Sequence, residues 1–228
     1  MIYLASKSPR RTELLQQIGV KNQILDIDVD EKINRSNSPQ DNVKALSVLK
    51  CQEGVRKIIS EGKSSYPVLA ADTIVVLGDK IFGKPREESD AISMLLELSG
   101  KTHLVMTAVT IGIMTEEEAK FHTISVSSKV EFSKLTASDC KEYCDTGEPF
   151  DKAGGYGIQG YGSAFIKKIN GSEAIIDNGG GTSDGRWVAP MGSQVVELGP
   201  LNKTIHHSNG EECLSAVSYT HLTLPTKA

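Results

Sequence analysis

The chain alternates, from its N-terminus to Ile169, between stretches typical of strands and stretches typical of helices. A two-residue apolar period or strong β-propensity predicts strands at 2–5, 23–29, 68–77, 80–82, 103–113, 125–135 and 164–169. Prolines and helical apolar spacing predict a helix that starts at 9 and others over 39–50, 85–98 and 138–144. Such alternation predicts an α/β fold with a mixed sheet, and argues against all-α and all-β folds.

The size and charge of the chain limit what it binds. Its 228 residues suffice for one domain, or for one domain with an appendage. The net charge of −4 argues against broad electrostatic binding to nucleic acid or to an anionic membrane, so neither is an expected partner. No apolar stretch is long enough to cross a bilayer, and Lys7, Arg10 and Arg11 interrupt the only early apolar run. We therefore expect no signal peptide and a cytoplasmic protein.

The cysteines are expected to be reduced thiols; they are Cys51, Cys140, Cys144 and Cys213. Cys140 and Cys144 are spaced to share a helix face, but no second pair of Cys or His residues completes a zinc site. The sequence therefore predicts no metal site built on cysteine.

The first predicted helix carries two cations at its unfavourable end. Ser8 suits the N-cap and Pro9 the first helical position, so Arg10 and Arg11 fall in the first turn. Each cation there costs roughly 0.3–1 kcal/mol, and a bound anion would reverse this cost. The motif indicates a phosphate site. The alternative is that both arginines point into water and only keep the surface soluble.

Asp72 is the strongest single candidate for chemistry, because it lies within an apolar strand. A carboxylate in such a place is unfavourable unless it is paired, bound to a metal or at the open end of the strand. These surroundings favour a general base or a metal ligand. The alternative is a structural aspartate that caps a turn or pairs with a lysine.

Acidic and basic residues near other predicted strand ends are weaker candidates. Asp30 and Glu31 carry oxygen ligands of the kind that Mg²⁺ prefers, although a solvated acidic loop explains them equally well. Lys50 and Lys84 are possible phosphate partners, and Lys84 is better placed because it follows Gly83 at the end of a predicted hairpin. Most lysines, however, are simply exposed.

The segment from Asp151 to Gly160 is dense in glycine, which allows a close backbone approach to a ligand. Lys152 adds a charge, and the amide of Gln159 offers a donor and an acceptor that can read the edge of a base. The segment matches neither the P-loop nor the dinucleotide fingerprint. A tight turn without a ligand is the alternative.

Several of these segments together resemble the Maf-like nucleoside triphosphate pyrophosphatases, over roughly the first three quarters of the chain. The stretch from Leu4 to Arg11 resembles the family signature. The other matching segments, in the family's order and spacing, are Glu13–Leu15, Ala71–Thr73, Gly83–Pro85, Leu98–Gly100, Asp151–Gly154 and Ile158–Gly160.

The resemblance implies a cytoplasmic enzyme that hydrolyses a nucleoside triphosphate between its α and β phosphates, with a divalent metal such as Mg²⁺ or Mn²⁺. It implies an elongated mixed sheet with flanking helices, in two lobes around a deep cleft, similar to the fold of inosine triphosphatases. It also implies a homodimer where the C-terminus is intact, and a house-cleaning role.

By the same resemblance Asp72 is the proton acceptor, and Glu31 and Asp72 hold the metal. Arg11, Thr73 and Gln159 match positions associated with substrate choice. The remaining polar lining of the cleft is matched by Ser8, Arg10, Lys50, Lys84 and Lys152.

The combination of Thr73 and Gln159 resembles that found in the branch of the family that acts on dTTP and UTP. A modified pyrimidine nucleotide is a further candidate substrate. A sister branch acts on 7-methyl-GTP. A rival of another class is a nucleotide-binding regulator of cell division without turnover.

The chain departs from the family after Ser172, so we predict a Maf-like domain over residues 1–172 and an atypical tail over 173–228. Family members usually continue with an aromatic residue, a Val-x-Gly-Leu-Pro-like segment and a final helix. Val217 to Ala228 is instead similar to translated sequencing-adapter sequence, and the segment before it reads as frame-shifted. We expect this tail to be poorly ordered and to lack the family's last helix.

Overall fold

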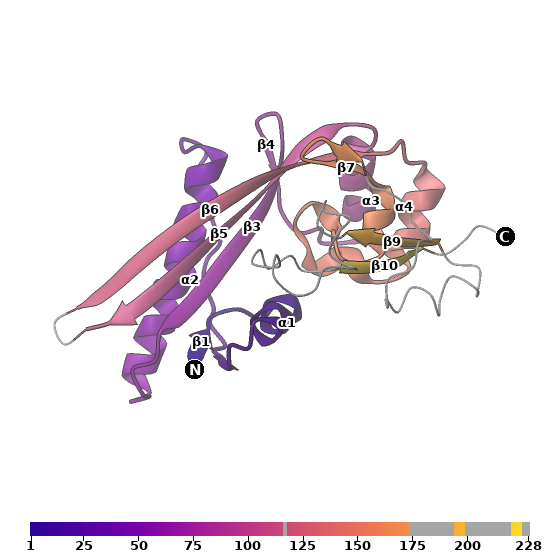
Figure 1. Cartoon of the computed structure of the whole chain (residues 1–228). Helices are drawn as coiled ribbons and strands as arrows, with labels where there is room; N and C mark the ends of the chain where they lie inside the picture. The colour runs from indigo at the N-terminus through magenta and orange to yellow at the C-terminus, as the bar shows by residue number, and fades with distance from the viewer. Residues whose placement is uncertain (116–117, 174–193, 199–219, 225–228) are drawn as a thin grey trace. The chain divides into compact units, whose positions relative to one another are not determined.

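The computed structural model describes residues 1–115, 118–173, 194–198 and 220–224 (Figure 1). The helices are α1 (Pro9–Gln17), α2 (Pro39–Ser60), α3 (Glu88–Leu98) and α4 (Ala137–Cys144), and the 3-10 turns are η1 (Glu148–Asp151), η2 (Ala153–Gly155) and η3 (Tyr161–Phe165). The strands of the main sheet are β1 (Ile2–Leu4), β2 (Asn22–Ile24), β3 (Val68–Leu77), β4 (Lys80–Phe82), β5 (Thr102–Met114), β6 (Ala119–Phe132), β7 (Ile166–Ile169) and β8 (Ser172–Glu173).

Eight of the described strands form one mixed sheet, which confirms the predicted fold class. The order is β2-β1-β3-β5-β6-β7-β8, and β4 pairs with β3. β1 runs parallel to both β2 and β3, whereas β3 with β5, β6 with β7 and β7 with β8 are antiparallel. Of the helices in the described ranges, none is long and apolar enough to cross a membrane.

Most of the predicted tail, 173–228, lies outside the described residues. Two short strands within it are described, β9 (Gln194–Leu198) and β10 (Thr220–Leu224), and they pair antiparallel. The domain boundary after residue 172 and the poor order of the tail stay predictions.

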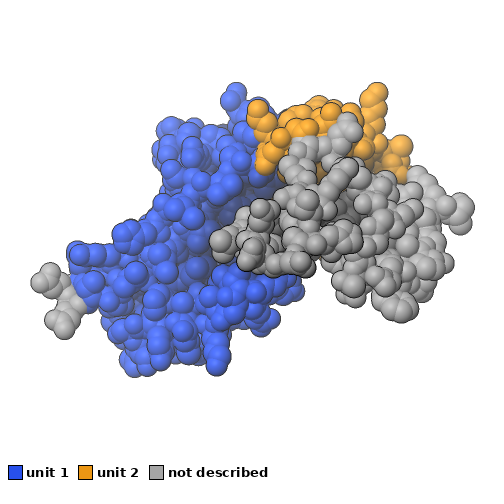
Figure 2. Space-filling model, in the orientation of Figure 1, with its two compact units in different colours: residues 1–81, 104–128 blue, residues 82–103, 129–228 orange. Residues whose placement is uncertain are grey.

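The chain divides into two compact units, which Figure 2 colours separately. The first unit comprises residues 1–81 and 104–128, and the second comprises 82–103 and 129–228. The cleft between two lobes that the family resemblance implies stays a prediction.

In the first unit, the long helix α2 packs along β3 (Figure 1). Cys51 and Val55 of α2 lie in one apolar cluster with Val68 and Ala70 of β3. Because side chains alternate between the two faces of a strand, the even-numbered residues of β3 face α2. This alternation determines which polar residues of β3 meet those of α2.

Several predicted boundaries were wrong because tertiary contacts end the elements. β2 ends at Ile24 rather than at 29: the Leu25 N–H still donates to the carbonyl of Leu4 at 2.9 Å, but the Asp26 carbonyl accepts from Lys57 Nζ at 2.6 Å. β6 runs over 119–132 rather than 125–135, and the Leu135 N–H donates to Ser99 Oγ at 2.7 Å. β7 begins at Ile166, since the turn η3 takes up the residues before it.

The described cysteines are buried and free, as expected; they are Cys51, Cys140 and Cys144. Burial raises the pKa of the Cys51 thiol to about 12 and that of the Cys140 thiol to about 11. Both thiols therefore stay protonated near neutral pH and serve as small apolar side chains. Cys213 lies outside the described residues.

In the second unit, α3 and α4 pack on each other, and a buried aromatic cluster contains His103. The His103 ring packs edge-on against Phe132, with centroids 4.8 Å apart, and its Nε2 lies 2.6 Å from the hydroxyl oxygen of Tyr156. Burial lowers the pKa of His103 to about 4 from its ordinary 6.5. The imidazole is therefore neutral in the folded protein at any pH near neutrality.

The free energy of unfolding should fall as the pH is lowered from about 6.5 to about 4, since His103 takes up a proton in the unfolded chain first. The difference of 2.5 pH units between 6.5 and about 4 corresponds to a total loss of about 3 kcal/mol. Urea unfolding at pH 7 and pH 5 measures this loss. The control is His103→Gln, which does not titrate but can still hydrogen-bond Tyr156. The wild type should lose about 2 kcal/mol more than the variant between the two pH values, and equal losses would contradict the prediction.

Candidate active site

The start of α1 has the predicted cap position but not the expected capping bond. Ser8 is the N-cap residue with extended backbone, and Pro9 is the first helical residue, as predicted. The Ser8 side chain makes no capping hydrogen bond. Instead, Ser6 Oγ accepts from the Ser8 N–H at 3.2 Å and from an Arg11 guanidinium nitrogen at 2.8 Å. Arg11 is thereby turned back over the loop that precedes its own helix.

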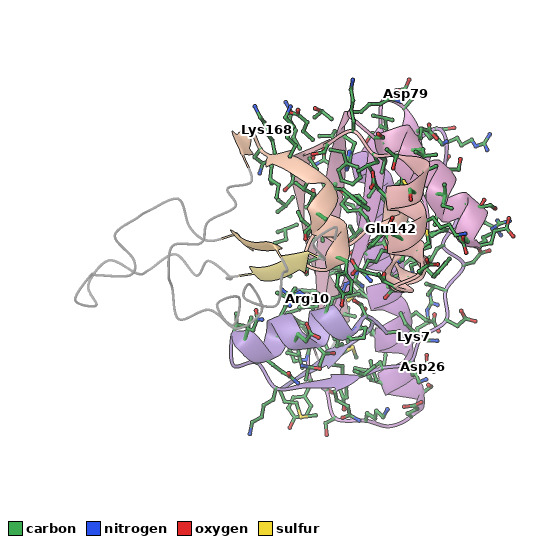
Figure 3. All side chains as sticks on the ribbon, turned by 90° about the vertical axis from the view of Figure 1, so that its right-hand side faces the viewer. Lys7, Arg10, Asp26, Asp79, Glu142 and Lys168 are labelled. Atoms are coloured by element: carbon green, nitrogen blue, oxygen red, sulfur yellow. The ribbon has the colours of Figure 1, made fainter. Side chains whose placement is uncertain are left out.

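The other two cations of this motif form ion pairs on the surface. Arg10 pairs with Glu13 on α1 at 3.0 Å, and Lys7 pairs with Asp26 at 2.7 Å (Figure 3). The two arginines predicted as a joint phosphate site therefore have different surroundings.

Arg11 is in electrostatic contact with the candidate catalytic residues. Its burial lowers the pKa of the guanidinium, and the charges of Asp72 and Glu31 act against that shift. The side chain is therefore neither simply solvated nor remote from the carboxylates, which argues against the solubility interpretation for Arg11.

Asp72 lies in the middle of β3, opposite Ala108 of β5, and only 6% of its surface is exposed. As an even-numbered residue of the strand it faces α2, where Lys50 is also buried. The Lys50 ammonium lies 2.5 Å from Asp72 Oδ1 and 2.8 Å from Glu31 Oε1. The structure thus brings together two carboxylates and a lysine from segments far apart in the sequence.

The pKa of Asp72 is raised above its ordinary value, and burial is the main cause. Glu31 also raises this pKa, whereas Lys50 and Arg11 lower it without cancelling the effect of burial. A carboxylate with a raised pKa is a stronger base than an exposed one, which suits the acceptance of a proton from water.

Thr73 does not join this cluster, because it is the next residue along the strand and faces the other side of the sheet. Its hydroxyl lies 3.0 Å from the hydroxyl of Thr107, its direct partner across β3 and β5. The substrate-selecting role that the resemblance gives Thr73 stays a prediction.

Asn42 is a residue of this region that the sequence analysis missed. It is 2% exposed, and its amide nitrogen donates to the carbonyls of Asn34, Asn37 and Ser38, at 3.0, 3.3 and 3.2 Å. Its amide oxygen accepts from the Asn34 N–H at 2.9 Å. Asn42 therefore fixes the loop that follows Glu31. The only sequence signal is an asparagine one turn after the N-cap Ser38.

Three predicted binding residues belong to the second unit, and their part in the site stays a prediction. Lys84 is exposed and follows Gly83, whose carbonyl accepts from the Gly154 N–H at 2.9 Å. Lys152 Nζ donates to Asp151 at 2.6 Å and to the carbonyl of Glu148 at 3.0 Å. Gln159 is exposed near the tip of the glycine-rich segment.

The donor set at Asp72 fits a divalent cation in its chemistry. The Lys50 ammonium contacts a carboxylate oxygen of Glu31 and one of Asp72, so both oxygens lie within reach of one cation. Hard cations such as Mg²⁺ commonly use one or two carboxylates together with substrate phosphates. Within the described part of the chain, no group of three or more His, Cys, Asp or Glu side chains could hold a metal on its own. A metal at this position would take its further ligands from water or from substrate phosphates.

Comparison with known proteins gives the family. A family model described as Maf-like protein matches residues 1–176. A dTTP/UTP pyrophosphatase of Saccharophagus degradans is 46% identical over 175 residues, which cover 77% of this chain and 81% of the relative. One of Aliivibrio fischeri is 47% identical over 172 residues, or 75% of this chain and 87% of the relative. One of Ralstonia nicotianae is 44% identical over 177 residues, with 75% and 84% covered. This protein therefore belongs to the Maf-like family.

Proposed function

We propose that this protein is a nucleoside triphosphate pyrophosphatase that hydrolyses dTTP and UTP to the monophosphate and pyrophosphate. The observation that carries the proposal is the buried Asp72 in contact with Lys50, in a chain 44–47% identical to relatives named dTTP/UTP pyrophosphatase. Modified pyrimidine nucleotides fit the same chemistry. A house-cleaning role follows from the removal of unwanted nucleotides.

In the proposed mechanism, Asp72 accepts a proton from a water molecule, and the water oxygen attacks the α phosphorus in line. The new O–P bond forms as the bond from the α phosphorus to the bridging oxygen breaks, and pyrophosphate leaves. Arg11 and Lys50 neutralise the phosphate charge and hold the triphosphate in position, which provides most of the acceleration. To reach the phosphates, Lys50 exchanges its carboxylate partners for phosphate oxygens.

The other predicted residues have supporting roles. Ser8, Arg10, Lys84 and Lys152 line the phosphate and sugar positions, while Thr73 and Gln159 select the base. Glu31 and Asp72 would hold a divalent cation, Mg²⁺ or Mn²⁺, which would supply further charge neutralisation at the phosphates.

We place the protein in the cytoplasm, and we expect a homodimer where the C-terminus is intact. Nucleic acid is not a partner in this proposal, in keeping with the net charge of −4.

The function is tested by incubating the purified protein with dTTP, UTP, CTP and 7-methyl-GTP, alone and in competition, with Mg²⁺ or Mn²⁺. We expect pyrophosphate release from dTTP and UTP at least tenfold faster than from CTP or 7-methyl-GTP, as base-reading hydrogen bonds commonly give. A preference for 7-methyl-GTP would assign the sister activity. Tight nucleotide binding without release of pyrophosphate would contradict the enzyme and favour a regulator.

A further inference from the structure

In the second unit, the carboxylate of Glu148 is an anchor for the backbone around Gln159. Its Oε1 accepts from the Tyr143 hydroxyl at 2.9 Å and from the Gly162 N–H at 3.4 Å, and its Oε2 accepts from the Tyr161 N–H at 2.7 Å. Burial, with Glu148 beside it, raises the pKa of Tyr143, so that its hydroxyl keeps its proton and remains a donor. A carboxylate with several donors is a strong acceptor.

Three glycines on either side of Gln159 pack closely on Glu148 and Tyr143. A Cβ at Gly160 would lie 2.3 Å from a carboxylate oxygen of Glu148, and one at Gly157 would lie 2.9 Å from the other. At Gly162 a Cβ would meet the Tyr143 hydroxyl oxygen at 2.7 Å. All three distances are below ordinary contact, so a side chain at any of these positions would displace the Glu148 carboxylate or the Tyr143 hydroxyl from where it lies, and glycine avoids this. The glycine density that suggested a ligand thus reflects, at these positions, packing on Glu148 and Tyr143.

Gln159 lies between two attachment points of this kind. Two residues before it, the Gly157 N–H donates to the Tyr143 hydroxyl at 3.3 Å, and two residues after it the Tyr161 N–H donates to Glu148. The Ser163 hydroxyl closes the turn with a 2.6 Å bond to the carbonyl of Gly160. The backbone on both sides of Gln159 is thus tied to the Tyr143–Glu148 pair.

This attachment of the backbone matters because a glutamine amide can form hydrogen bonds with either uracil or cytosine. Its oxygen and nitrogen can pair with the N–H and carbonyl of uracil, and after a half turn of the amide they can pair with cytosine. Discrimination between the two bases therefore depends on how firmly the glutamine is held relative to the rest of the site. Anything that loosens its backbone should weaken the choice of base more than the chemistry on the phosphates.

We propose that Glu148 is the positioning residue for Gln159, and that through it Glu148 determines the preference for uracil and thymine over cytosine. The proposal rests on the function given above, in which Gln159 reads the base. It assigns Glu148 no contact with the substrate.

The test uses the full chain and the variant Glu148→Gln, which has the same shape but presents one oxygen where the carboxylate presents two. We expect the ratio of kcat/KM for UTP to that for CTP to fall by about tenfold, since at least one donor loses its acceptor and the turn loosens. The loss should appear mainly in KM, with kcat for UTP nearly unchanged. The matched control is Glu142→Gln on α4, a surface carboxylate (Figure 3) that accepts only from Ser138 among the bonds described here, and it should leave the ratio unchanged.

A merely structural role is separated from positioning by a double-mutant cycle with Gln159→Ala. If Glu148 acts through Gln159, Glu148→Gln adds no further loss of selectivity in the Gln159→Ala background. Additive losses, or an unchanged ratio in Glu148→Gln, would overturn the proposal. Where Glu148→Gln fails to fold, Tyr143→Phe removes the hydroxyl donor from the same pair and should lower the ratio in the same direction.

Failure of the proposed function is distinguishable from failure of this inference. Dissociation constants for UTP and CTP analogues with an imido bridge between the α and β phosphates are measured alongside turnover. If the wild type binds the uracil analogue preferentially but does not hydrolyse UTP, only the proposed enzymatic activity is overturned. The same variants are then compared by their dissociation constants. A wild type with no preference between the two analogues overturns the inference about Glu148.

Discussion

Replacement of Asp72 by asparagine is expected to lower kcat for dTTP by about 10²–10⁴-fold, the usual contribution of a positioned general base. Asparagine has nearly the same shape and can still accept a hydrogen bond from Lys50, which also keeps its partner Glu31. The fold should therefore survive, and the loss should be in the chemical step. Steady-state pyrophosphate release, with circular dichroism to verify folding, measures the effect.

The matched control for this variant is Asp79→Asn, an exposed carboxylate in the turn between β3 and β4, which should keep full activity. The pH profile gives a second readout. Since the pKa of Asp72 is raised, kcat/KM of the wild type should decline on its acidic side at a pH above the ordinary aspartate value of 3.8. Retention of more than a tenth of the activity in Asp72→Asn, or an equal loss in Asp79→Asn, would show that Asp72 is not the base.

The fold class was predictable from sequence because its signals are local. Pro9 and Pro39 each stand at the first helical position, as predicted, and the β-prone run at Thr73 to Leu77 lies inside β3. The ends of strands were less predictable. Residues 25–29 keep a strand-like alternation, but the backbone of Asp26 bonds to Lys57 instead of continuing the ladder. Such competition between partners depends on the folded chain.

The candidate site was predictable only where a residue contrasts with its neighbours. Asp72 contrasts with an apolar strand, so a role for it could be inferred from sequence alone. Its partner Lys50 is 22 residues earlier on a helix, and their contact requires α2 to lie on the even-numbered face of β3. Asn42 and Glu148 carry no such contrast, since polar residues near loops are common, and their importance follows from what they bind in the folded structure.

Replacement of Lys50 by methionine is expected to lower the free energy of unfolding at pH 7 by about 3–5 kcal/mol, the usual cost when one partner of a buried ion pair is removed. The pair qualifies as buried, because the side chains of Lys50 and Asp72 are 11% and 8% exposed. Methionine fills a similar volume, so the cost reflects the charge left on Asp72 rather than a cavity. Urea unfolding measures the change, and Lys44→Met on the same helix α2, at a more exposed position, is the control.

The origin of this cost can be tested by removing the second charge. In Lys50→Met/Asp72→Asn the unpaired buried carboxylate that Lys50→Met alone leaves on β3 is also gone, so most of the lost stability should return. The pH dependence has a definite sign. Without Lys50, burial and Glu31 raise the pKa of Asp72 in the folded variant still further above 3.8. A carboxyl with a raised folded pKa contributes stability at low pH and loses it as the pH rises through that pKa. The deficit of Lys50→Met relative to the wild type should therefore shrink as the pH falls toward 4. A deficit that is independent of pH, or that persists in the double variant, would mean that the packing of the lysine stem rather than its charge holds α2 against β3.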